Sequence, residues 1–278
     1  MILSLDFAAF ALAVPSTMAL LGYVATVLFS EGKGAWLRVV LISGWVAHAL
    51  AIVFDVAGIG SATPGARFGF APALSATVWL VLAVHVVESR FVPLPVVWRT
   101  LAALGAAAVA LAWAFPGEFH PHAASPWAPL HWVLGMASYG LFGAAVLHAA
   151  LLTGAERRMR SGRASASSAV AASPTGLPLL QLEKLTFRFV MAGFVVLSAT
   201  LLLGWSFAAP WRWDHKTVFS TLSWVVFAGL LAGRHAFGWR GRRATRWLYA
   251  GAVLLLLAYT GSRFVWEVVL QRPPGGAT

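Results

Sequence analysis

Apolar residues along this chain fall into long continuous runs, and polar residues are mostly confined to the short connections between them. A run of about 20 apolar residues is the length that an α-helix needs to cross the hydrocarbon core of a bilayer. The runs lie roughly at 5–29, 36–54, 70–88, 95–115, 130–152, 186–208, 217–233 and 247–270. This pattern predicts an all-α, polytopic integral membrane bundle with about eight transmembrane helices.

The composition supports a membrane protein. The chain has 278 residues, of which 60% are hydrophobic and only 10% are charged. A soluble domain cannot bury that much apolar surface. The absence of cysteine excludes disulfides, thiolate metal sites and thioether attachment of haem to this chain. The first 30 residues lack a basic leading region and an A-x-A cleavage site, so we expect a retained first helix rather than a signal peptide.

Lysine and arginine are distributed unevenly between the two sets of connections. Fifteen of them fall on one side of the predicted bundle, whereas the other side holds only Arg67, Arg212, Lys216, Arg263 and Arg272. The richer side is expected to face the cytoplasm, which places both termini outside. The protein is therefore predicted to be a multi-pass membrane protein. Because this asymmetry accounts for the net charge of +11, no nucleic-acid partner is expected.

One connection divides the predicted spans into two groups. The segment "SGRASASSAVAASPTGLP" at 161–178 is rich in serine, alanine and proline and is typical of a flexible linker. We expect a five-helix membrane part at 1–152, a cytoplasmic linker at 153–185 and a three-helix part at 186–272. Together they are expected to form a single membrane domain.

The connection "SFAAPWRWDHKT" at 206–217 gathers aromatic side chains and charges of both signs. Tryptophan is more frequent on the predicted outer surface than on the cytoplasmic edge. The outer residues are Trp113, Trp127, Trp132, Trp205, Trp211, Trp213 and Trp266. An aromatic belt explains tryptophan at both interfaces, but it does not explain the excess on one side. The excess favours an aromatic platform that includes Trp205, Trp211 and Trp213.

Two histidines lie at the predicted outer surface. His131 opens the fifth span, and Gly135, Ser138 and Phe142 follow it on one helix face, where small residues allow close approach of a helix or a flat ligand. A neutral imidazole at this depth suits an axial ligand of haem iron; the alternative is hydrogen bonding to water or headgroups. His215 follows a carboxylate that would orient or charge it, unless it is simply a solvated loop residue.

Other histidines lie inside the predicted spans or in loops. His48 is in the middle of the second span, where it either ligates something or forms hydrogen bonds across helices. His148 follows His131 by 17 residues, or roughly 25 Å along a helix, so the two mark opposite ends of a candidate cavity. His120 and His122 form a weak H-x-H metal pattern that is better explained as an outer loop.

Cations accompany these residues on the outer side. Arg263 has Glu267 four residues later, so it either forms an intrahelical ion pair or offers its guanidinium to a carboxylate such as a haem propionate. Arg212 and Lys216 offer the same chemistry. Histidine, aromatic faces and cations together are what an external haem site requires. No hydrolase, NTPase or dinucleotide motif occurs, so no independent catalytic activity is predicted.

Three stretches carry a resemblance to a known family. "PWRWDHKTVFSTLSWVVFAGLL" with "GWRGRRATRW" resembles the tryptophan-rich WWD region of the cytochrome c assembly family, the CcsA- and CcmC-type haem-handling membrane proteins. "LHWVLGMASYGLF" resembles the family segment that begins with an outward-facing histidine, and "YTGSRFVWEVV" is similar to the end of its final span. The length, the spans and the "GWRGRR" loop are most similar to the smaller YpjD/HemX-like branch. The resemblance covers most of the chain and is best from 130 to 266.

The resemblance implies roles for particular residues. His131 corresponds to the first external haem-ligand histidine, and Trp211, Trp213 and Asp214 correspond to the core of the tryptophan-rich loop. Two departures argue against full synthetase activity: the loop is short, and no histidine follows His235. We hypothesise that His215, which stands where CcsA-type sequences usually have proline, supplies the second axial ligand.

Together with the resemblance, these observations predict a multi-pass protein of the bacterial inner (plasma) membrane that binds haem b non-covalently and assists cytochrome c biogenesis at the outer face. Haem would reach that face through the bundle, past His48 or His148. The expected partners are apocytochrome c and an assembly protein with a periplasmic domain. The alternative is a HemX-like regulator or scaffold linked to haem synthesis, which would act through its cytoplasmic face without delivering haem. A transporter of another planar or anionic substrate is a third possibility.

Overall fold

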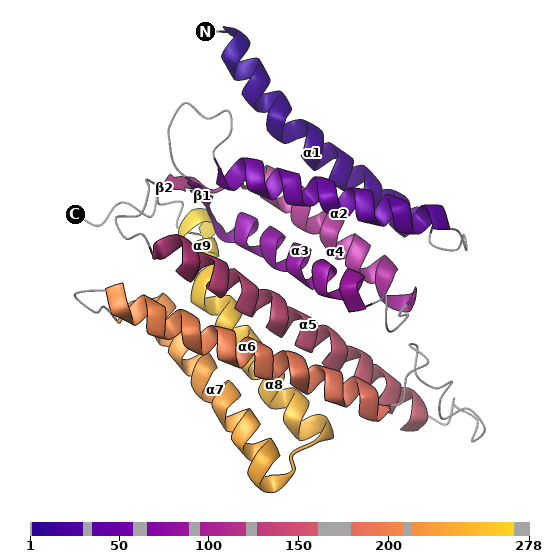
Figure 1. The fold of residues 1–278 in the computed structure, drawn as a ribbon, viewed down its shortest axis with the longest axis vertical. Helices are drawn as coiled ribbons and strands as arrows, with labels where there is room; N and C mark the ends of the chain where they lie inside the picture. Colours follow the sequence, from indigo (N-terminus) through magenta and orange to yellow (C-terminus); the bar gives the residue numbers. More distant parts are fainter. Residues whose placement is uncertain are drawn as a thin grey trace. The chain divides into compact units, whose positions relative to one another are not determined.

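The computed structural model describes residues 2–29, 35–57, 66–88, 95–120, 127–160, 179–207 and 213–269. This part of the chain is almost entirely helical (Figure 1). Its long helices are α1 (Ile2–Leu28), α2 (Ala35–Val56), α3 (Phe70–Glu88), α4 (Pro95–Ala114), α5 (Ala128–Arg160), α6 (Leu179–Phe207), α7 (His215–Phe237) and α8 (Gly241–Leu256). Each overlaps a predicted span, although the ends of α5, α6 and α8 differ from the predicted ones by several residues, and the all-α membrane prediction is confirmed.

The last span changes its helical geometry along its length. After α8 the chain forms a π-helical turn, η2 (Leu257–Gly261), a short helix, α9 (Ser262–Phe264), and a second π-helical turn, η3 (Val265–Val269). A two-stranded antiparallel sheet pairs β1 (Ala66–Phe68) with β2 (Glu118–His120), and Arg67 lies opposite Phe119. The apolar pattern predicted neither the π-helical turns nor the sheet.

Several helices meet the requirements for crossing a membrane. Among the described residues, six helical segments are long and apolar enough: Trp36–Val56, Phe70–Glu88, Val97–Ala114, Ala128–Arg160, Leu179–Ser206 and His215–Phe237. Leu12–Leu28 is a shorter apolar helix. Helices α5 and α6 also extend into 153–185, the range predicted as linker. The low-complexity segment 161–178 itself lies outside the described residues.

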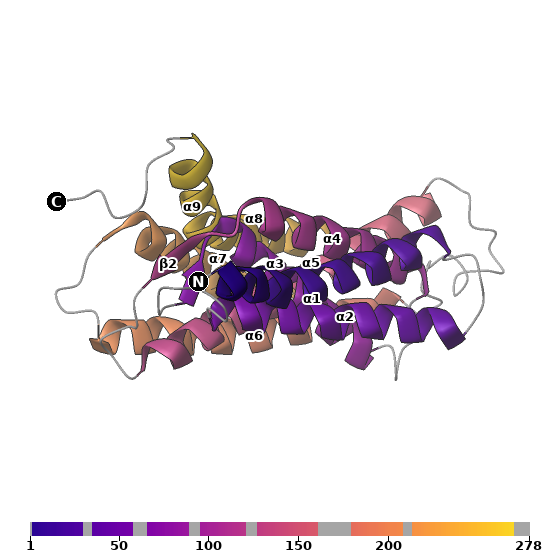
Figure 2. The ribbon, with the colours of Figure 1, turned by 90° about the horizontal axis from the view of Figure 1, so that it is seen from above.

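The chain divides into two compact units. The first comprises Met1–Val86, Val97–Pro126 and Thr260–Thr278, and the second comprises Val87–Val96 and Trp127–Tyr259. The first unit therefore contains α1, α2 and α4 with most of α3, and the second contains α5 to α8. In the first unit, α1 and α2 lie side by side in both views (Figures 1 and 2).

Glycines let α1 and α2 approach closely. A Cβ atom added to Gly22 would lie 2.8 Å from the Cα of Gly44, which is closer than real Cβ contacts. Only a residue without a side chain fits at this crossing, as is common where membrane helices pack.

Two indoles join α2 to α3. The Nε1 of Trp45 donates to the carbonyl of Trp79 at 3.2 Å, and the Nε1 of Trp79 donates to the carbonyl of Trp45 at 3.1 Å. Their rings are stacked, with centroids 5.2 Å apart and only 2° between the planes. The arrangement satisfies both indole N–H groups inside the bundle, where an unpaired donor is costly.

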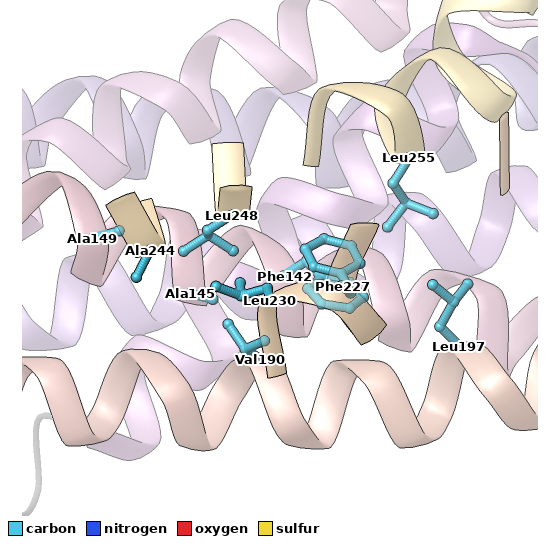
Figure 3. Packing of buried hydrophobic residues seen from close by; sticks show 10 residues of the cluster. All are labelled: Phe142, Ala145, Ala149, Val190, Leu197, Phe227, Leu230, Ala244, Leu248 and Leu255. Atoms are coloured by element: carbon cyan, nitrogen blue, oxygen red, sulfur yellow. The ribbon is translucent and has the colours of Figure 1, made fainter. Parts of the chain in front are cut away.

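The second unit is built around stacked aromatic rings. Phe142 of α5 and Phe227 of α7 are buried with ring centroids 3.8 Å apart and 5° between the planes (Figure 3). Glycines admit both rings: a Cβ on Gly193 would lie 3.1 Å from Phe142, and one on Gly251 would lie 2.7 Å from Phe227. The surrounding buried cluster comprises Ala145, Ala149, Val190, Leu197, Leu230, Ala244, Leu248 and Leu255.

Polar bonds between helices add to this core. The hydroxyl of Ser223 donates to the carbonyl of Gly251 at 2.9 Å, which joins α7 to α8. The hydroxyl of Tyr139 donates to the carbonyl of Leu255, just before the first π-helical turn. A π-helical turn displaces carbonyls from their usual α-helical partners, and a tyrosine hydroxyl satisfies one of them here.

Candidate functional site

His131 lies in the first turn of α5. The helix begins at Ala128, and Pro129 occupies a first-turn position where its missing N–H costs nothing. The Nδ1 of His131 is 3.0 Å from the carbonyl oxygen of Thr200 in α6. A carbonyl only accepts hydrogen bonds, so Nδ1 carries the hydrogen and Nε2 of the neutral ring carries the lone pair. A histidine that binds a metal is usually oriented in this way by a backbone carbonyl.

The backbone of α6 fixes the position of the His131 ring. A Cβ atom on Gly204 would lie 2.8 Å from Cε1 of the imidazole. The ring therefore rests directly against a residue that has no side chain, one turn beyond its carbonyl anchor. Trp205 follows this glycine and is 66% exposed. The end of α6 thus carries the glycine on which the imidazole of α5 rests and, at the next position, an exposed indole.

The start of α7 provides a second set of polar residues. Asp214 is the N-cap of this helix, and its Oδ1 accepts from the backbone N–H of Thr217 at 2.8 Å. The side chain of Asp214 therefore caps the helix backbone, which is a typical role of aspartate at the N-cap. The sequence interpretation assigned Asp214 to His215 and did not consider capping. The D-x-x-T spacing before an apolar run was the available signal.

His215, the proposed second ligand, is the first residue of α7, and its side chain is exposed. Trp213 is 68% exposed. The ammonium of Lys216 lies 5.2 Å from the centre of the Tyr259 ring, and its charge acts on the imidazole of His131. The structure therefore brings the start of α7 to the same end of the second unit as His131. Trp211 and Arg212 lie outside the described residues.

His48 is buried in a hydrogen-bond network of the first unit. Its Nδ1 is 3.0 Å from the hydroxyl of Tyr23, and its Nε2 is 2.7 Å from the hydroxyl of Ser75. Both ring nitrogens are therefore engaged with α1 and α3. Of the two roles left open by the sequence, the described contacts match hydrogen bonding across helices. Periodicity alone did not identify the two hydroxyl partners.

His148 is buried in the middle part of α5. Its Nδ1 is 2.8 Å from the carbonyl of Ala144, and its Nε2 is 2.9 Å from Oε1 of Glu88. The side chains of His148 and Glu88 are only 1% and 8% exposed. The sequence did not identify the carboxylate partner of His148, which ends α3.

Arg263 lies in α9, which belongs to the first unit, whereas the residues around His131 belong to the second. The side chain of Glu267, its predicted partner, is outside the described set, as are the side chains of His120 and His122. Among the residues that the structure does describe, no three histidine or acidic side chains converge into a metal cage. Of the described candidate residues, those near His131 at the predicted outer end of the second unit are Trp205, Trp213, His215 and Lys216.

Comparisons with known proteins agree with this architecture. A model of the family described as cytochrome c assembly protein matches residues 17–270. The inner membrane protein YpjD of Escherichia coli K12 is 28% identical over 248 residues, which cover 86% of this chain and 90% of that protein. The cytochrome c biogenesis protein CcsA of Parasynechococcus marenigrum is 26% identical over 211 residues, covering 66% and 69%. No solved structure matches.

The chain is a multi-pass protein of the inner membrane, as its helices and its similarity to YpjD show. It belongs to the cytochrome c assembly protein family, whose model covers nearly the whole chain. Membership of this family supports a role in cytochrome c biogenesis.

Proposed function

We propose that this protein binds haem b non-covalently at its outer face and presents it during cytochrome c biogenesis. The observation that carries the proposal is the hydrogen bond from Nδ1 of His131 to the carbonyl of Thr200. This bond fixes the tautomer that an iron ligand requires, and contact with Gly204 fixes the ring orientation. The chemistry of the donor therefore fits haem iron.

Other residues complete the proposed site. His215 would supply the second axial ligand, and the indoles of Trp205, Trp211 and Trp213 would contact the faces or edges of the porphyrin. Lys216 and Arg212 would offer cations to the propionates, while Asp214 orders the start of α7. Bound haem would supply the iron porphyrin that becomes attached to an apocytochrome. The partners would be that apocytochrome and an assembly protein with a periplasmic domain.

The proposal is tested by measuring haem in the purified protein. The chain is expressed with ample haem supply, purified in detergent, and assayed by absorption spectroscopy and as the pyridine haemochrome. We expect bound haem in the unaltered protein and a clear loss in His131→Ala. His235→Ala is the matched control, because that side chain is exposed near the opposite end of α7. Absence of haem from the unaltered protein would sink the proposal.

The second ligand is tested separately. His215→Ala should convert a six-coordinate absorption spectrum to a five-coordinate one, or should lower the haem content. An unchanged six-coordinate spectrum removes His215 from the site but leaves the role of His131 intact.

A second candidate function is regulation of haem synthesis by a HemX-like protein. It is favoured by an ordered charged cluster at the predicted cytoplasmic end, where Glu183 contacts Arg234 at 2.9 Å and Arg240 at 3.4 Å. A deletion strain distinguishes the two functions. Loss of c-type cytochromes supports presentation of haem, whereas normal cytochromes with altered haem levels support regulation.

A further inference from the structure

Four exposed arginines lie where α7 turns into α8 (Figure 1). We name the set Arg240, Arg242, Arg243 and Arg246 the basic corner. We propose that the basic corner binds the phosphate headgroup of an anionic phospholipid. The positive-inside rule accounts for the presence of cations on this side but does not require a particular arrangement. In the structure, a defined backbone turn and aromatic contacts hold the basic corner, and this rule does not explain either of them.

The turn between α7 and α8, which contains Arg240, has a defined backbone. Gly238 ends α7 with a φ of 63°, and its N–H bonds to the carbonyls of Arg234 and Gly233. Gly241, with a φ of 55°, starts α8. Positive φ values of this kind favour glycine strongly. The residues between these two glycines are therefore held in a tight connection.

Two tryptophan rings, those of Trp239 and Trp247, pack against each other at this turn. A Cβ atom on Gly233 would lie 2.4 Å from the indole of Trp239, so this indole rests directly on the backbone of α7. The ring centroids of Trp239 and Trp247 are 5.2 Å apart. The guanidinium carbon of Arg243 is 4.3 Å from the centroid of the Trp239 ring. This cation–π contact restricts the Arg243 guanidinium over a fixed ring, which lowers the entropy lost when it binds an anion.

The local acidic groups are already paired. Glu183 accepts from Arg234 and also contacts Arg240, and Arg234 packs 3.5 Å from the ring of Phe187. Glu156 lies near Gly241, and its other carboxylate oxygen contacts Arg160 at 3.2 Å. Protein carboxylates therefore neutralise only part of the positive charge here.

Three arginines have no acidic partner in the described part of the chain. Arg242, Arg243 and Arg246 take part in no salt bridge there. Arg242 and Arg246 are four residues apart on one face of α8. All three lie in the first turns of this helix, where the macrodipole favours anions rather than cations. A phosphate would offset part of this positive charge and interact favourably with the helix terminus.

The occupant that fits is a lipid because apolar side chains adjoin the charges. Phe237, the last residue of α7, is 77% exposed, and Trp247 of α8 is also exposed. Such residues sit at the level of the headgroups when they end a membrane helix. An anionic phospholipid combines the phosphate that arginine binds in bidentate fashion with acyl chains for these apolar side chains.

The test is a lipid titration of the purified protein, followed by native mass spectrometry. Phosphatidylglycerol is compared with phosphatidylcholine. We expect tighter binding of phosphatidylglycerol to the unaltered protein. The triple variant R242Q/R243Q/R246Q should bind it on the order of 100-fold more weakly, at about five-fold per arginine. Arg→Gln keeps a good helix former at each position.

The matched control is R99Q/R157Q/R158Q, which removes three exposed arginines of the predicted cytoplasmic side that lie outside the basic corner. It should retain most of the affinity for phosphatidylglycerol. Equal weakening in both triple variants would overturn a local site and leave only diffuse attraction. Equal binding of the two lipids to the unaltered protein would also overturn it, even if the variants fail to fold. Inorganic phosphate should not compete at equal concentration; full competition would identify a free-anion site instead of a lipid site.

Discussion

Gly204 is the residue on which the orientation of His131 depends most directly. In Gly204→Ala the new methyl group would lie 2.8 Å from Cε1 of the imidazole, so the ring has to move. We expect haem affinity to fall at least ten-fold and the absorption spectrum to change, because ligand geometry determines coordination. Haem titration of the purified variant measures this effect.

Gly135→Ala is the control for that experiment. Gly135 lies one turn after His131, and a Cβ atom there would be 3.8 Å from the methyl group of Thr200, an ordinary contact. Equal losses of haem in both variants would show that any added methyl group in this region disturbs binding, and the specific role of Gly204 would be rejected.

Two substitutions of Asp214 separate its helix-capping hydrogen bond from an effect of its negative charge on the haem site. Asp214→Ala removes the bond to the N–H of Thr217 and should lower the free energy of unfolding by about 0.5–2 kcal/mol. Asp214→Asn keeps a capping acceptor and should keep that stability. Thermal unfolding in detergent measures both. If Asn alters the haem spectrum while stability is unchanged, the carboxylate charge acts on the site in addition to capping.

The sequence identified His131 but not the carbonyl of Thr200 that orients its ring. A histidine at the start of an apolar run is visible from position alone, whereas Thr200 contributes a backbone carbonyl that any residue would supply. The partners of His48 and His148 were missed for a related reason. Tyr23, Ser75 and Glu88 lie in other helices, and the apolar pattern sets the depth of a residue but not the rotation of one helix against another.

At the scale of elements, the crossing of α1 and α2 depends on glycine. Gly22→Ala places a methyl group 2.8 Å from the Cα of Gly44, where no flexible side chain can move aside. We expect a loss of about 1–3 kcal/mol in the free energy of unfolding, because the helices are forced apart. Gly154→Ala is the control, since its methyl group would meet only the flexible guanidinium of Arg158 at 3.7 Å. A Gly22→Ala protein as stable as the control would contradict this packing.

The positions of the long helices were predictable because the length of an apolar run sets a span. Their ends were less predictable. Helix α5 continues to Arg160 and α6 begins at Leu179, because polar and charged residues extend a helix that its apolar part has already formed. The π-helical turns and the strand pair were not predicted, since neither has an apolar period of its own in segments this short.

At the scale of the whole molecule, sidedness is the prediction that all proposed roles share. The distribution of lysine and arginine places 161–178 in the cytoplasm and 121–126 outside. Alkaline phosphatase fused within 121–126 should therefore be active, and the same fusion within 161–178 should be inactive. A cytoplasmic fluorescent reporter should give the opposite pattern. Reversed activities would move His131 to the cytoplasmic face and contradict the proposed haem site.

The length of α5 makes the tilt of this helix depend on the thickness of the surrounding bilayer. Its 33 residues extend about 50 Å, whereas the hydrocarbon layer is about 30 Å thick. Arginines in the last turn keep that end among the headgroups, so a rigid helix adapts to a thinner or thicker bilayer chiefly by tilting. Lipids with different acyl-chain lengths would consequently hold the imidazole at different heights below the outer surface.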